Sequence, residues 1–332
     1  MKFPLRLNLA MGAYLARKAR QGERRFPLVL MLEPLHACNL ACRGCGRIRE
    51  YADTLDRKLD LQTCLHEARA CQAPVVSVSG GEPLLHPEID GIVGGLCRMG
   101  RHVYLCTNGI KLAEFVERNE PHENLFLNVH LDGLEELHDR LADRPGVFRA
   151  ATEGIRRAKA KGFRVTTNTT VYKTTSDREL ENLFRHLTSL KVDGFFVSPG
   201  FHYGVLNGDD FLGKEEIHQK FRALEPLFKR FRFFSTPLYL EFLCGRRQYA
   251  CAPWGTVTRN PMGWKAPCYL ITDSHYPDFD SFMASVDWER YRSGEDPRCS
   301  QCMMHSGFEP AAVFELGGNW RDLAKILLWN LA

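Results

Sequence analysis

Short apolar runs alternate with amphipathic stretches over the first 235 residues of the chain. The runs are rich in β-branched residues and predict strands at 28–32, 75–79, 103–107, 125–131, 164–171 and 194–198. Between them, apolar residues recur every three to four positions, which predicts helices at 61–71, 148–162 and 177–192. Repeated strand–helix units predict a parallel sheet, open or closed as a partial barrel, with the active site on the loops after the strands.

The alternation of predicted strands and helices ends near residue 235, and the sequence after it is rich in cysteine, glycine and tryptophan. We therefore expect an α/β fold in which a partial (β/α)6 barrel, residues 26–234, precedes a small cysteine-rich domain and tail, residues 235–332. Residues 1–25 form a basic segment, since residues 1–30 hold seven Lys or Arg and one acid, Glu23. We expect an amphipathic helix there, lying either on an anionic membrane face or over the bottom of the barrel.

Composition indicates a globular protein that works inside the cell. The chain has 332 residues, of which 44% are hydrophobic, but it has no uninterrupted apolar run of membrane-spanning length and no signal-peptide pattern. In a reducing compartment the 12 cysteines do not indicate a disulfide framework, so we expect some of them to bind metal. The net charge of +4 is too small to indicate nucleic-acid binding.

Three cysteines follow the first predicted strand in the pattern C-x3-C-x2-C: Cys38, Cys42 and Cys45. Three thiolates match an iron–sulfur cluster that keeps one iron open for a ligand. A structural zinc site, which needs four closed ligands, and free buried thiols, which need no fixed spacing, are the alternatives. The motif resembles that of the radical S-adenosylmethionine (SAM) superfamily, although Gly44 stands where an aromatic residue is usual. The resemblance implies a [4Fe-4S] cluster whose open iron binds SAM.

Two further segments resemble SAM-binding motifs of that superfamily. The SVSGGEP turn closes the second strand and matches the GGEP motif, which implies contacts to the methionine amino group from Gly80, Gly81, Glu82 and Pro83. Taken alone, such a turn is a tight strand-to-helix connection. Alternating positions on the fourth strand share one face and resemble the ribose-binding positions, although a solvated strand end is the alternative: Asn128, His130 and Asp132.

A second cysteine group lies in the C-terminal part of the chain. Cys251, Gly263 and Cys268 fit the C-x(9–15)-G-x4-C signature, and CSQC adds Cys299 and Cys302. This arrangement resembles the auxiliary-cluster domains called SPASM or twitch, which implies a second iron–sulfur cluster. A zinc site formed by the same four thiolates, or unligated thiols, are the alternatives.

Nine segments, in unchanged order between residues 26 and 313, resemble the HpnH family of hopanoid biosynthesis, the adenosylhopane synthases. They are FPLVLMLEPL, CNLACRGCG, QAPVVSVSGGEPLLH, VYLCTN, VHLDG, GFRV, VDGFFVSPG, CAPWGTVTR and GWKAPCYL. The resemblance implies that SAM is cleaved reductively and that the 5'-deoxyadenosyl radical adds to the alkene of a hopene, diploptene. It also implies a flavodoxin- or ferredoxin-type reductant. One departure is Ser306, where we expect a cysteine.

Addition to an alkene leaves a carbon radical that needs one hydrogen atom, and a thiol is a suitable donor. Cys106 lies at the end of the third strand, and the period of two places Tyr104, Cys106 and Asn108 on one face, near the predicted cofactor. We therefore predict Cys106 as the donor and Asn108 as a cofactor-binding residue. A cysteine packed in the sheet as a small hydrophobe is the alternative, and Cys268 is a rival donor.

Two other functions fit parts of the sequence. A radical SAM peptide maturase of the SPASM or twitch type would explain both cysteine groups. An iron–sulfur scaffold or electron-transfer protein would explain the cysteines but not the GGEP turn. We expect a cytoplasmic enzyme with a triterpene substrate and a peripheral contact at the inner membrane face.

Overall fold

One curved sheet organises the molecule in the computed structural model, which describes residues 4–202, 204–206, 210–316 and 319–331. Residues 1–3 of the predicted basic segment and residue 332 of the predicted tail lie outside the described residues. Within them, the strand order is β6-β5-β4-β3-β2-β1-β7-β8-β9. The strands are β1 Val29–Leu32, β2 Val75–Val78, β3 His102–Thr107, β4 Leu125–His130, β5 Arg164–Val171, β6 Gly194–Pro199, β7 Thr256–Asn260, β8 Gly263–Pro267 and β9 Thr272–Tyr276.

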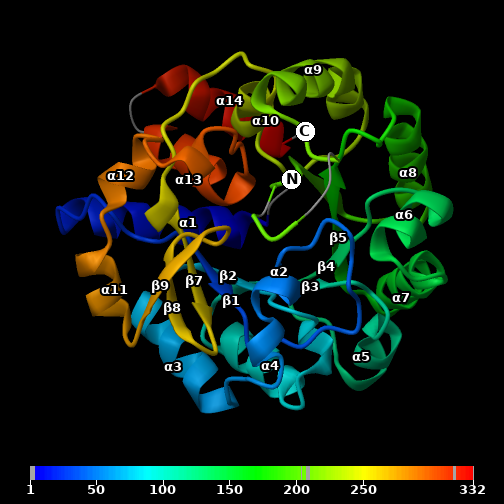
Figure 1. Cartoon of the computed structure of the whole chain (residues 1–332), viewed down its shortest axis with the longest axis horizontal. Coiled ribbons are helices and arrows are strands. Elements are labelled where there is room, and N and C mark those ends of the chain that lie inside the picture. Colours follow the sequence, from blue (N-terminus) through cyan, green and yellow to red (C-terminus); the bar gives the residue numbers. More distant parts are fainter. Residues whose placement is uncertain (1–3, 203, 207–209, 317–318, 332) are drawn as a thin grey trace.

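The barrel strands β1 to β6 are parallel throughout, and helices cover their outer face (Figure 1). These helices are α3 Leu61–Cys71, α4 Ile89–Arg98, α5 Leu112–Arg118, α6 Glu135–Ala142, α7 Val147–Lys161 and α8 Asp177–Ser189. The Asp60 carboxylate caps α3 by accepting from the Thr63 backbone N–H at 2.7 Å, and Ser176 caps α8 in the same way. The six predicted strands, the parallel sheet and the three predicted helices are confirmed.

Both faces of the sheet carry apolar residues. Helices pack on the outer face, and side chains fill the inside of the barrel. Leu30, Val76, Leu105 and Leu127 are fully buried in the large core between strands and helices. Inside the barrel, near the amino ends of the strands, a second cluster contains Leu7, Val75, Tyr104, Phe126 and Phe234. The polar site therefore has room only toward the carboxyl ends of the strands.

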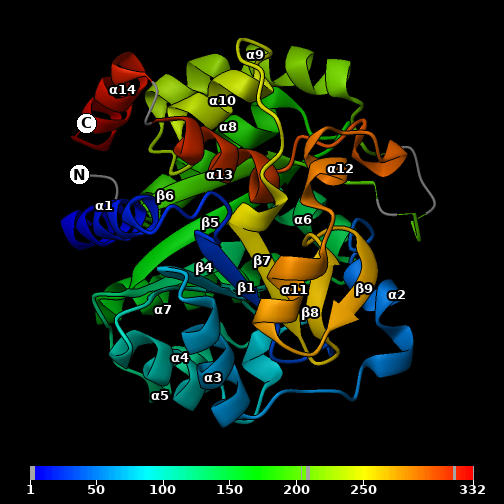
Figure 2. The ribbon, with the colours of Figure 1, turned by 90° about the vertical axis from the view of Figure 1, so that its left-hand side faces the viewer.

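Helix α1, Leu5–Arg20, closes the bottom of the barrel through Leu7 and Met11, which pack onto this inner cluster. The expectation of a helix over the bottom of the barrel is confirmed. Figure 2 shows α1 and the short helix α2, Arg47–Glu50, at opposite ends of the strands. Because α2 follows the cysteine loop, α1 lies at the end away from the predicted cofactor site.

The C-terminal part continues the same sheet. β7 pairs parallel with β1, and β8 and β9 follow as antiparallel neighbours. The sequence predicts no strand after residue 198, because these short strands carry little apolar alternation. The remaining helices are α9 Lys214–Arg230, α10 Pro237–Leu243, α11 Phe279–Ser285, α12 Trp288–Arg292, α13 His305–Glu315 and α14 Trp320–Leu331. Short 3-10 helices lie at Ala52–Thr54, Pro83–Leu85, Pro253–Gly255 and Pro297–Cys299.

Candidate active site

The three cysteines of the first motif lie on the loop after β1, and all three are partly exposed. The Cys45 backbone N–H donates to the Cys42 carbonyl oxygen at 3.1 Å, and Arg49 donates to the carbonyl oxygens of both. Burial raises the pKa of Cys38 to about 11. The pKa of Cys42 is raised by burial and then by the charges of Cys45 and Cys38. Thiols that oppose one another's ionisation fit a cationic group such as an iron–sulfur cluster, which compensates their charge.

Gly44 departs from the superfamily pattern, and a tyrosine from another strand fills the space. A Cβ at Gly44 would overlap the Tyr172 hydroxyl and would lie 2.8 Å from the ring carbon that bears it. Tyr172 directly follows β5 and is buried. Its pKa is raised by burial first, and then by Asp132, Cys42 and Cys45. An aromatic ring therefore lies beside the cysteine loop even though the loop itself carries a glycine.

The SGGEP turn after β2 packs directly against the backbone of the cysteine loop. The Gly81 N–H donates to the Leu35 carbonyl oxygen at 3.2 Å, and the Glu82 N–H donates to the Ala37 carbonyl oxygen at 2.9 Å. At Gly80, φ is +108° and an added Cβ would lie 2.6 Å from the Leu35 carbonyl oxygen. Glycine is required there for both reasons. The structure therefore brings the predicted cluster loop and the predicted SAM-binding turn together.

The Glu82 carboxylate joins the ends of β2 and β3. Its side chain is 1% exposed and accepts hydrogen bonds from the Thr107 hydroxyl at 2.8 Å, the Asn108 N–H at 2.8 Å and the Leu84 N–H at 3.0 Å. Burial raises its pKa to about 7. Pro83 is also buried and begins the 3-10 helix Pro83–Leu85. The Glu82 side chain is thus a positioning group, and the partly exposed edge of the turn belongs to Gly80 and Gly81.

The other predicted cofactor positions lie at the carboxyl ends of β3 and β4. The Asn108 side chain donates to the Asn39 side chain of the cysteine loop at 2.7 Å. His130 Nε2 lies 2.8 Å from Asp132 Oδ2, and Asp132 also accepts from the Thr170 N–H. Burial acts to lower the pKa of His130, but Asp132 outweighs it, so the pKa of His130 is raised. His130 and Asp132 form an oriented pair beside the loop.

A row of polar side chains crosses the inside of the barrel below these residues. The Ser77 hydroxyl lies 3.2 Å from the Cys106 sulfur, the Asn128 amide donates to the same sulfur at 3.5 Å, and Asn128 Oδ1 accepts from Thr166 at 3.0 Å. Burial raises the pKa of Cys106, so the thiol keeps its proton. Asn128, predicted to contact the ribose, is therefore bonded to Cys106 and Thr166.

The floor under this row is apolar and aromatic. Tyr104 stacks on Phe126 with ring centroids 5.0 Å apart, and Phe196 and Phe234 meet these rings edge-on. Cys106 consequently lies between polar side chains above and aromatic side chains below, on the face that the strand period predicts.

The four C-terminal cysteines also gather in space. The pKa of Cys251 is raised, first by burial and then by the negative charges of the other three thiolates, Cys302, Cys268 and Cys299. This coupling indicates that the other three thiols lie near Cys251. An added Cβ at Gly307 would overlap the Cys251 sulfur, so α13 packs directly on this group. These thiols fit a second iron–sulfur cluster. Within the described parts of the chain, no set of three or more His, Cys, Asp or Glu side chains is arranged to hold a single metal ion.

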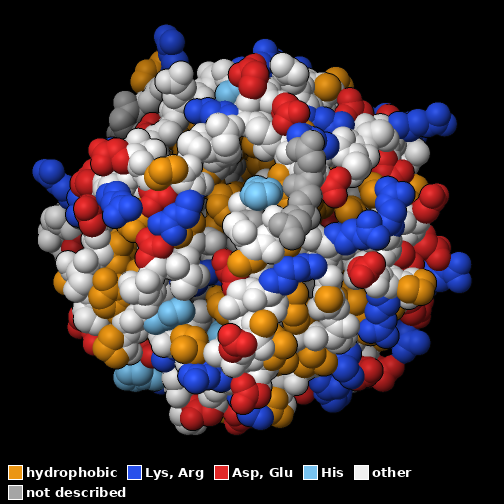
Figure 3. Space-filling model, in the orientation of Figure 1, with side chains coloured by type: hydrophobic (Ala, Val, Ile, Leu, Met, Phe, Trp, Pro, Cys, Tyr) orange, Lys and Arg blue, Asp and Glu red, His pale blue; other side chains and the backbone are white. Residues whose placement is uncertain are grey.

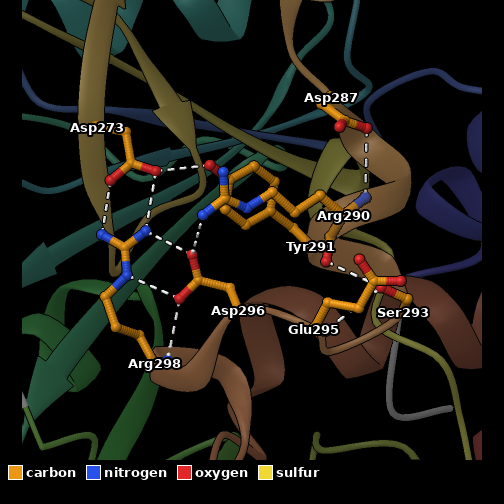
Figure 4. A network of polar contacts seen from close by, with 8 residues as sticks. All are labelled: Asp273, Asp287, Arg290, Tyr291, Ser293, Glu295, Asp296 and Arg298. Atoms are coloured by element: carbon orange, nitrogen blue, oxygen red, sulfur yellow. Dashed lines mark hydrogen bonds and ion pairs between the residues drawn. The ribbon is translucent and has the colours of Figure 1, made fainter.

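An ion-pair network fixes the segment that carries Cys299. Figure 4 shows Arg298 between Asp273 of β9 and Asp296, with Nη1 2.6 Å from Asp273 and Nη2 2.7 Å from Asp296. Tyr291 donates to Asp273 at 2.6 Å. Asp296 is 2% exposed and its carbonyl oxygen accepts from the Cys299 N–H. The network holds Cys299 against the β8–β9 hairpin.

A buried polar cluster that sequence reasoning missed joins the two cysteine groups. The Arg47 guanidinium lies over the Tyr269 ring, 3.9 Å from its centroid, and pairs with Glu33 at 3.4 Å and Glu50 at 3.6 Å. Lys265 is fully buried, donates to the Tyr269 carbonyl oxygen at 3.0 Å, and has its pKa lowered by burial to about 8. Arg47 follows Cys45 by two positions and Tyr269 directly follows Cys268. The sequence feature that could have indicated this cluster is the lysine at the centre of the segment GWKAP, Lys265.

The part of the chain that carries the first cysteine site matches a known protein family. Residues 32–187 match the radical SAM superfamily, and this span contains the cysteine loop, the glycine turn and the end of β4. Over these residues the chain is similar to radical SAM domains. The cofactors of radical SAM domains are a [4Fe-4S] cluster and SAM, which the gathered thiols and the adjoining turn fit. Residues 195–326 match a family described only as a domain of unknown function, DUF3463.

Curated relatives of the radical SAM domain differ in function. The chain is 30% identical over 184 residues to AdoMet-dependent heme synthase of Methanosarcina barkeri, covering 52% of this chain and 51% of that protein. It is 24% identical to PqqA peptide cyclase of Gluconobacter oxydans, covering 79% of this chain and 76% of that protein. The chain thus spans about half the length of the heme synthase, the relative with the higher identity. These relatives do not support the hopanoid assignment.

Solved structures share the fold. SuiB of Streptococcus suis bound to the precursor peptide SuiA superposes with a TM-score of 0.65 at 15% identity, covering 88% of this chain and 73% of that one. SuiB bound to S-adenosylmethionine gives a TM-score of 0.65 at 16% identity, covering 86% of this chain and 69% of that one. At these identities the likeness shows the fold and nothing finer.

Proposed function

We propose that this chain is an enzyme that cleaves SAM reductively and directs the resulting radical at a substrate bound at the loop end of the barrel. The contact between the cysteine loop and the SGGEP turn supports this most strongly, because it joins three thiols to a turn of partly exposed glycine backbone. Cys38, Cys42 and Cys45 would hold the cluster. When bound, the cluster supplies the electron, from a flavodoxin- or ferredoxin-type reductant, that splits SAM into methionine and a 5'-deoxyadenosyl radical.

The chain's own residues then orient the nucleoside and the substrate. Asn108 is fixed by Asn39, and His130 is fixed by Asp132, so both groups are held before SAM arrives. Tyr172 excludes water from the side of the loop that Gly44 leaves open. The aromatic floor closes the barrel from below. A reactive radical is thereby separated from solvent, which limits side reactions.

Anaerobic incubation of the iron-loaded protein with SAM and a reductant tests this proposal. We expect methionine and 5'-deoxyadenosine from the wild-type protein and none from Cys42→Ser. The opposite finding, no SAM cleavage by protein with a full complement of iron and sulfide, would reject the enzyme assignment and leave an iron–sulfur scaffold.

For the substrate, the comparisons favour a peptide. PqqA peptide cyclase aligns over most of both chains, and the SuiB structure that shares this fold was solved with its precursor peptide. The gathered C-terminal cysteines support the same reading, because an auxiliary cluster can accept the electron that an oxidative peptide cross-link releases. We therefore propose peptide maturation as the first candidate function.

Addition to the alkene of a hopene, diploptene, is the second candidate, and Cys106 favours it. Radical addition leaves a tertiary carbon radical, and the protonated Cys106 thiol inside the barrel can donate the hydrogen atom that saturates it. The thiyl radical left behind takes one electron from the reductant and one proton from solvent. The aromatic floor beside Cys106 also suits a hydrocarbon better than a peptide.

Product masses separate the two candidates. Incubation with a peptide extract of the source cells should give free 5'-deoxyadenosine and a peptide that has lost two hydrogens. Incubation with diploptene in detergent micelles should instead give an adenosylated, saturated product and consume the 5'-deoxyadenosyl group. If only the modified peptide forms, the hopene reaction is rejected. If only the adenosylated product forms, peptide maturation is rejected.

A further inference from the structure

Exposed apolar side chains concentrate on two terminal helices. Among the described residues, nine large hydrophobic side chains are exposed, and seven of them lie on α1 or α14. The seven are Leu5, Leu9, Trp320, Leu323, Leu327, Leu328 and Leu331, and Trp320 is 74% exposed. Single exposed leucines need no explanation, but a cluster of this kind on two helices marks an interaction surface.

Two of the three charged residues of α14, Asp322 and Lys325, face the protein, whereas Arg321 is exposed. Arg247 holds Asp322 through two hydrogen bonds of 2.8 Å and 2.6 Å, and Lys325 pairs with Glu241 of α10. Asn330 is buried as well. A helix on the surface of a protein in water normally turns its apolar stripe inward, so the outward stripe of α14 needs a partner that is itself apolar.

The two helices lie at the same end of the molecule. Figures 1 and 2 both show the start of α1 near the end of α14, with both helices on the left-hand side of Figure 2. Figure 3 shows the opposite, loop end, where apolar, basic and acidic side chains are mixed. The exposed apolar side chains of α1 and α14 therefore lie at the same end of the molecule, near the amino ends of the barrel strands. We call these seven side chains together the terminal-helix surface.

Positive charges gather beside this surface, although Arg6 pairs with Glu123 and Arg25 pairs with Glu289. Arg321 is an exposed arginine on α14. Five more exposed arginines lie on α1 or just beyond its end: Arg6, Arg17, Arg20, Arg24 and Arg25. The acidic residue Glu23 is paired with Lys18. The chain as a whole has a net charge of only +4, so the positive charge is concentrated here. Apolar side chains within a basic surround are complementary to an anionic bilayer.

We propose that the terminal-helix surface binds the face of an anionic lipid bilayer. Leucines of α1 and α14 and the ring of Trp320 enter the interfacial layer, while the arginines contact lipid phosphates. Binding is peripheral, because no helix among the described residues is long and apolar enough to cross a membrane. The loop end, with the cysteine site, then faces away from the lipid. The proposal does not depend on which substrate the enzyme uses.

Vesicle co-sedimentation of the full iron-loaded chain tests the proposal. We expect pelleting with vesicles of phosphatidylglycerol and phosphatidylcholine and little with phosphatidylcholine alone. Leu327→Glu combined with Leu328→Glu should weaken binding about tenfold or more, because two buried apolar side chains become charged. Met262→Glu is the matched control, since Met262 is an exposed apolar residue outside the surface, and it should bind as the wild-type protein does. Circular dichroism and iron content should be unchanged in all variants.

Tryptophan fluorescence gives a second measurement of vesicle binding. It uses the wild-type protein, so it does not depend on whether the glutamate variants fold. Trp320 emission should shift to shorter wavelength when anionic vesicles are added, and Trp320→Phe should lose that shift. Equal pelleting of all variants, or no pelleting of the wild-type protein, would overturn the proposal. A concentration-dependent dimer in light scattering that Leu327→Glu with Leu328→Glu dissociates would assign the surface to a second copy of the chain instead. SAM cleavage by any of these variants is a separate measurement that tests only the proposed function.

Discussion

Substitution of Gly81 by alanine should disturb the cluster loop more than any other part of the molecule. A Cβ at Gly81 would overlap the Ala37 carbonyl oxygen and lie 2.5 Å from the His36 carbonyl oxygen. Both atoms belong to the backbone immediately before Cys38, so no side-chain rotation relieves the overlap. To restore normal contacts of about 3.2 Å, the loop must move by roughly 1 Å.

The energetic effect follows from the overlap and from two hydrogen bonds. Forcing one extra carbon into a packed site costs about 1–3 kcal/mol. The bonds from the Gly81 and Glu82 N–H groups to Leu35 and Ala37, now 3.2 Å and 2.9 Å, lengthen as the loop moves, and each contributes about 1 kcal/mol. We therefore expect a cost of about 2–4 kcal/mol located at the loop. A loss of 2 kcal/mol alone weakens SAM binding about thirtyfold.

Equilibrium binding of SAM to the iron-loaded protein, together with iron and sulfide analysis and thermal unfolding, measures this effect. Gly12→Ala is the matched control, because nothing lies within 4 Å of a Cβ there and the position is helical. We expect Gly12→Ala to keep wild-type iron and SAM affinity, and Gly81→Ala to lose affinity before it loses its fold. Wild-type SAM affinity and iron content in Gly81→Ala would refute the close approach of the turn to the cysteine loop.

Three other predictions concern the two cysteine groups, the thiol and a buried acid. Iron and sulfide analysis should give about eight irons per chain, and about four when Cys38, Cys42 and Cys45 are replaced by alanine; about four in the wild-type protein would remove the auxiliary cluster. Cys106→Ala, assayed with diploptene in deuterated buffer, should still cleave SAM but lose the deuterated saturated product; an unchanged yield and deuterium content would exclude the donor role. Burial raises the pKa of Glu82 from 4.5 to about 7, so its contribution to stability is fully present below about pH 4.5 and is lost as the pH rises through 7. Thermal unfolding of Glu82→Gln should therefore depend less on pH over that window, and equal slopes would contradict the assignment.

The barrel was predictable because its strands are short runs rich in apolar and β-branched residues. Runs such as PVVSV and NLFLNVH are typical of buried parallel strands, and each of the strands β1 to β6 lies within a residue or two of its predicted range. The same holds for helices with a strict apolar period, such as α8. Local sequence thus determined the elements, and their order determined the topology.

Side-chain partners across strands were not predictable from spacing. Asn128 lies on the predicted face, yet its amide is bonded to Cys106 and Thr166, because those residues come from neighbouring strands in parallel register. The placement of β7 beside β1 depends on contacts more than 200 residues apart in the chain, as the pair Val29 and Thr256 shows. Period and motif locate residues along one element, and only the register between elements decides which side chains meet.

The cluster around Arg47 shows why the two cysteine groups cannot be considered separately. Burying charges is costly unless each is paired, and here two cations, Arg47 and Lys265, lie among two carboxylates, Glu33 and Glu50. Removing one member would leave an uncompensated buried charge, so the four groups hold one another in place. Because Arg47 belongs to the first cysteine loop and Lys265 to the strand that ends at the second, this pairing fixes the distance between the two sites. We expect electron exchange between clusters bound at the two sites to depend on this fixed separation.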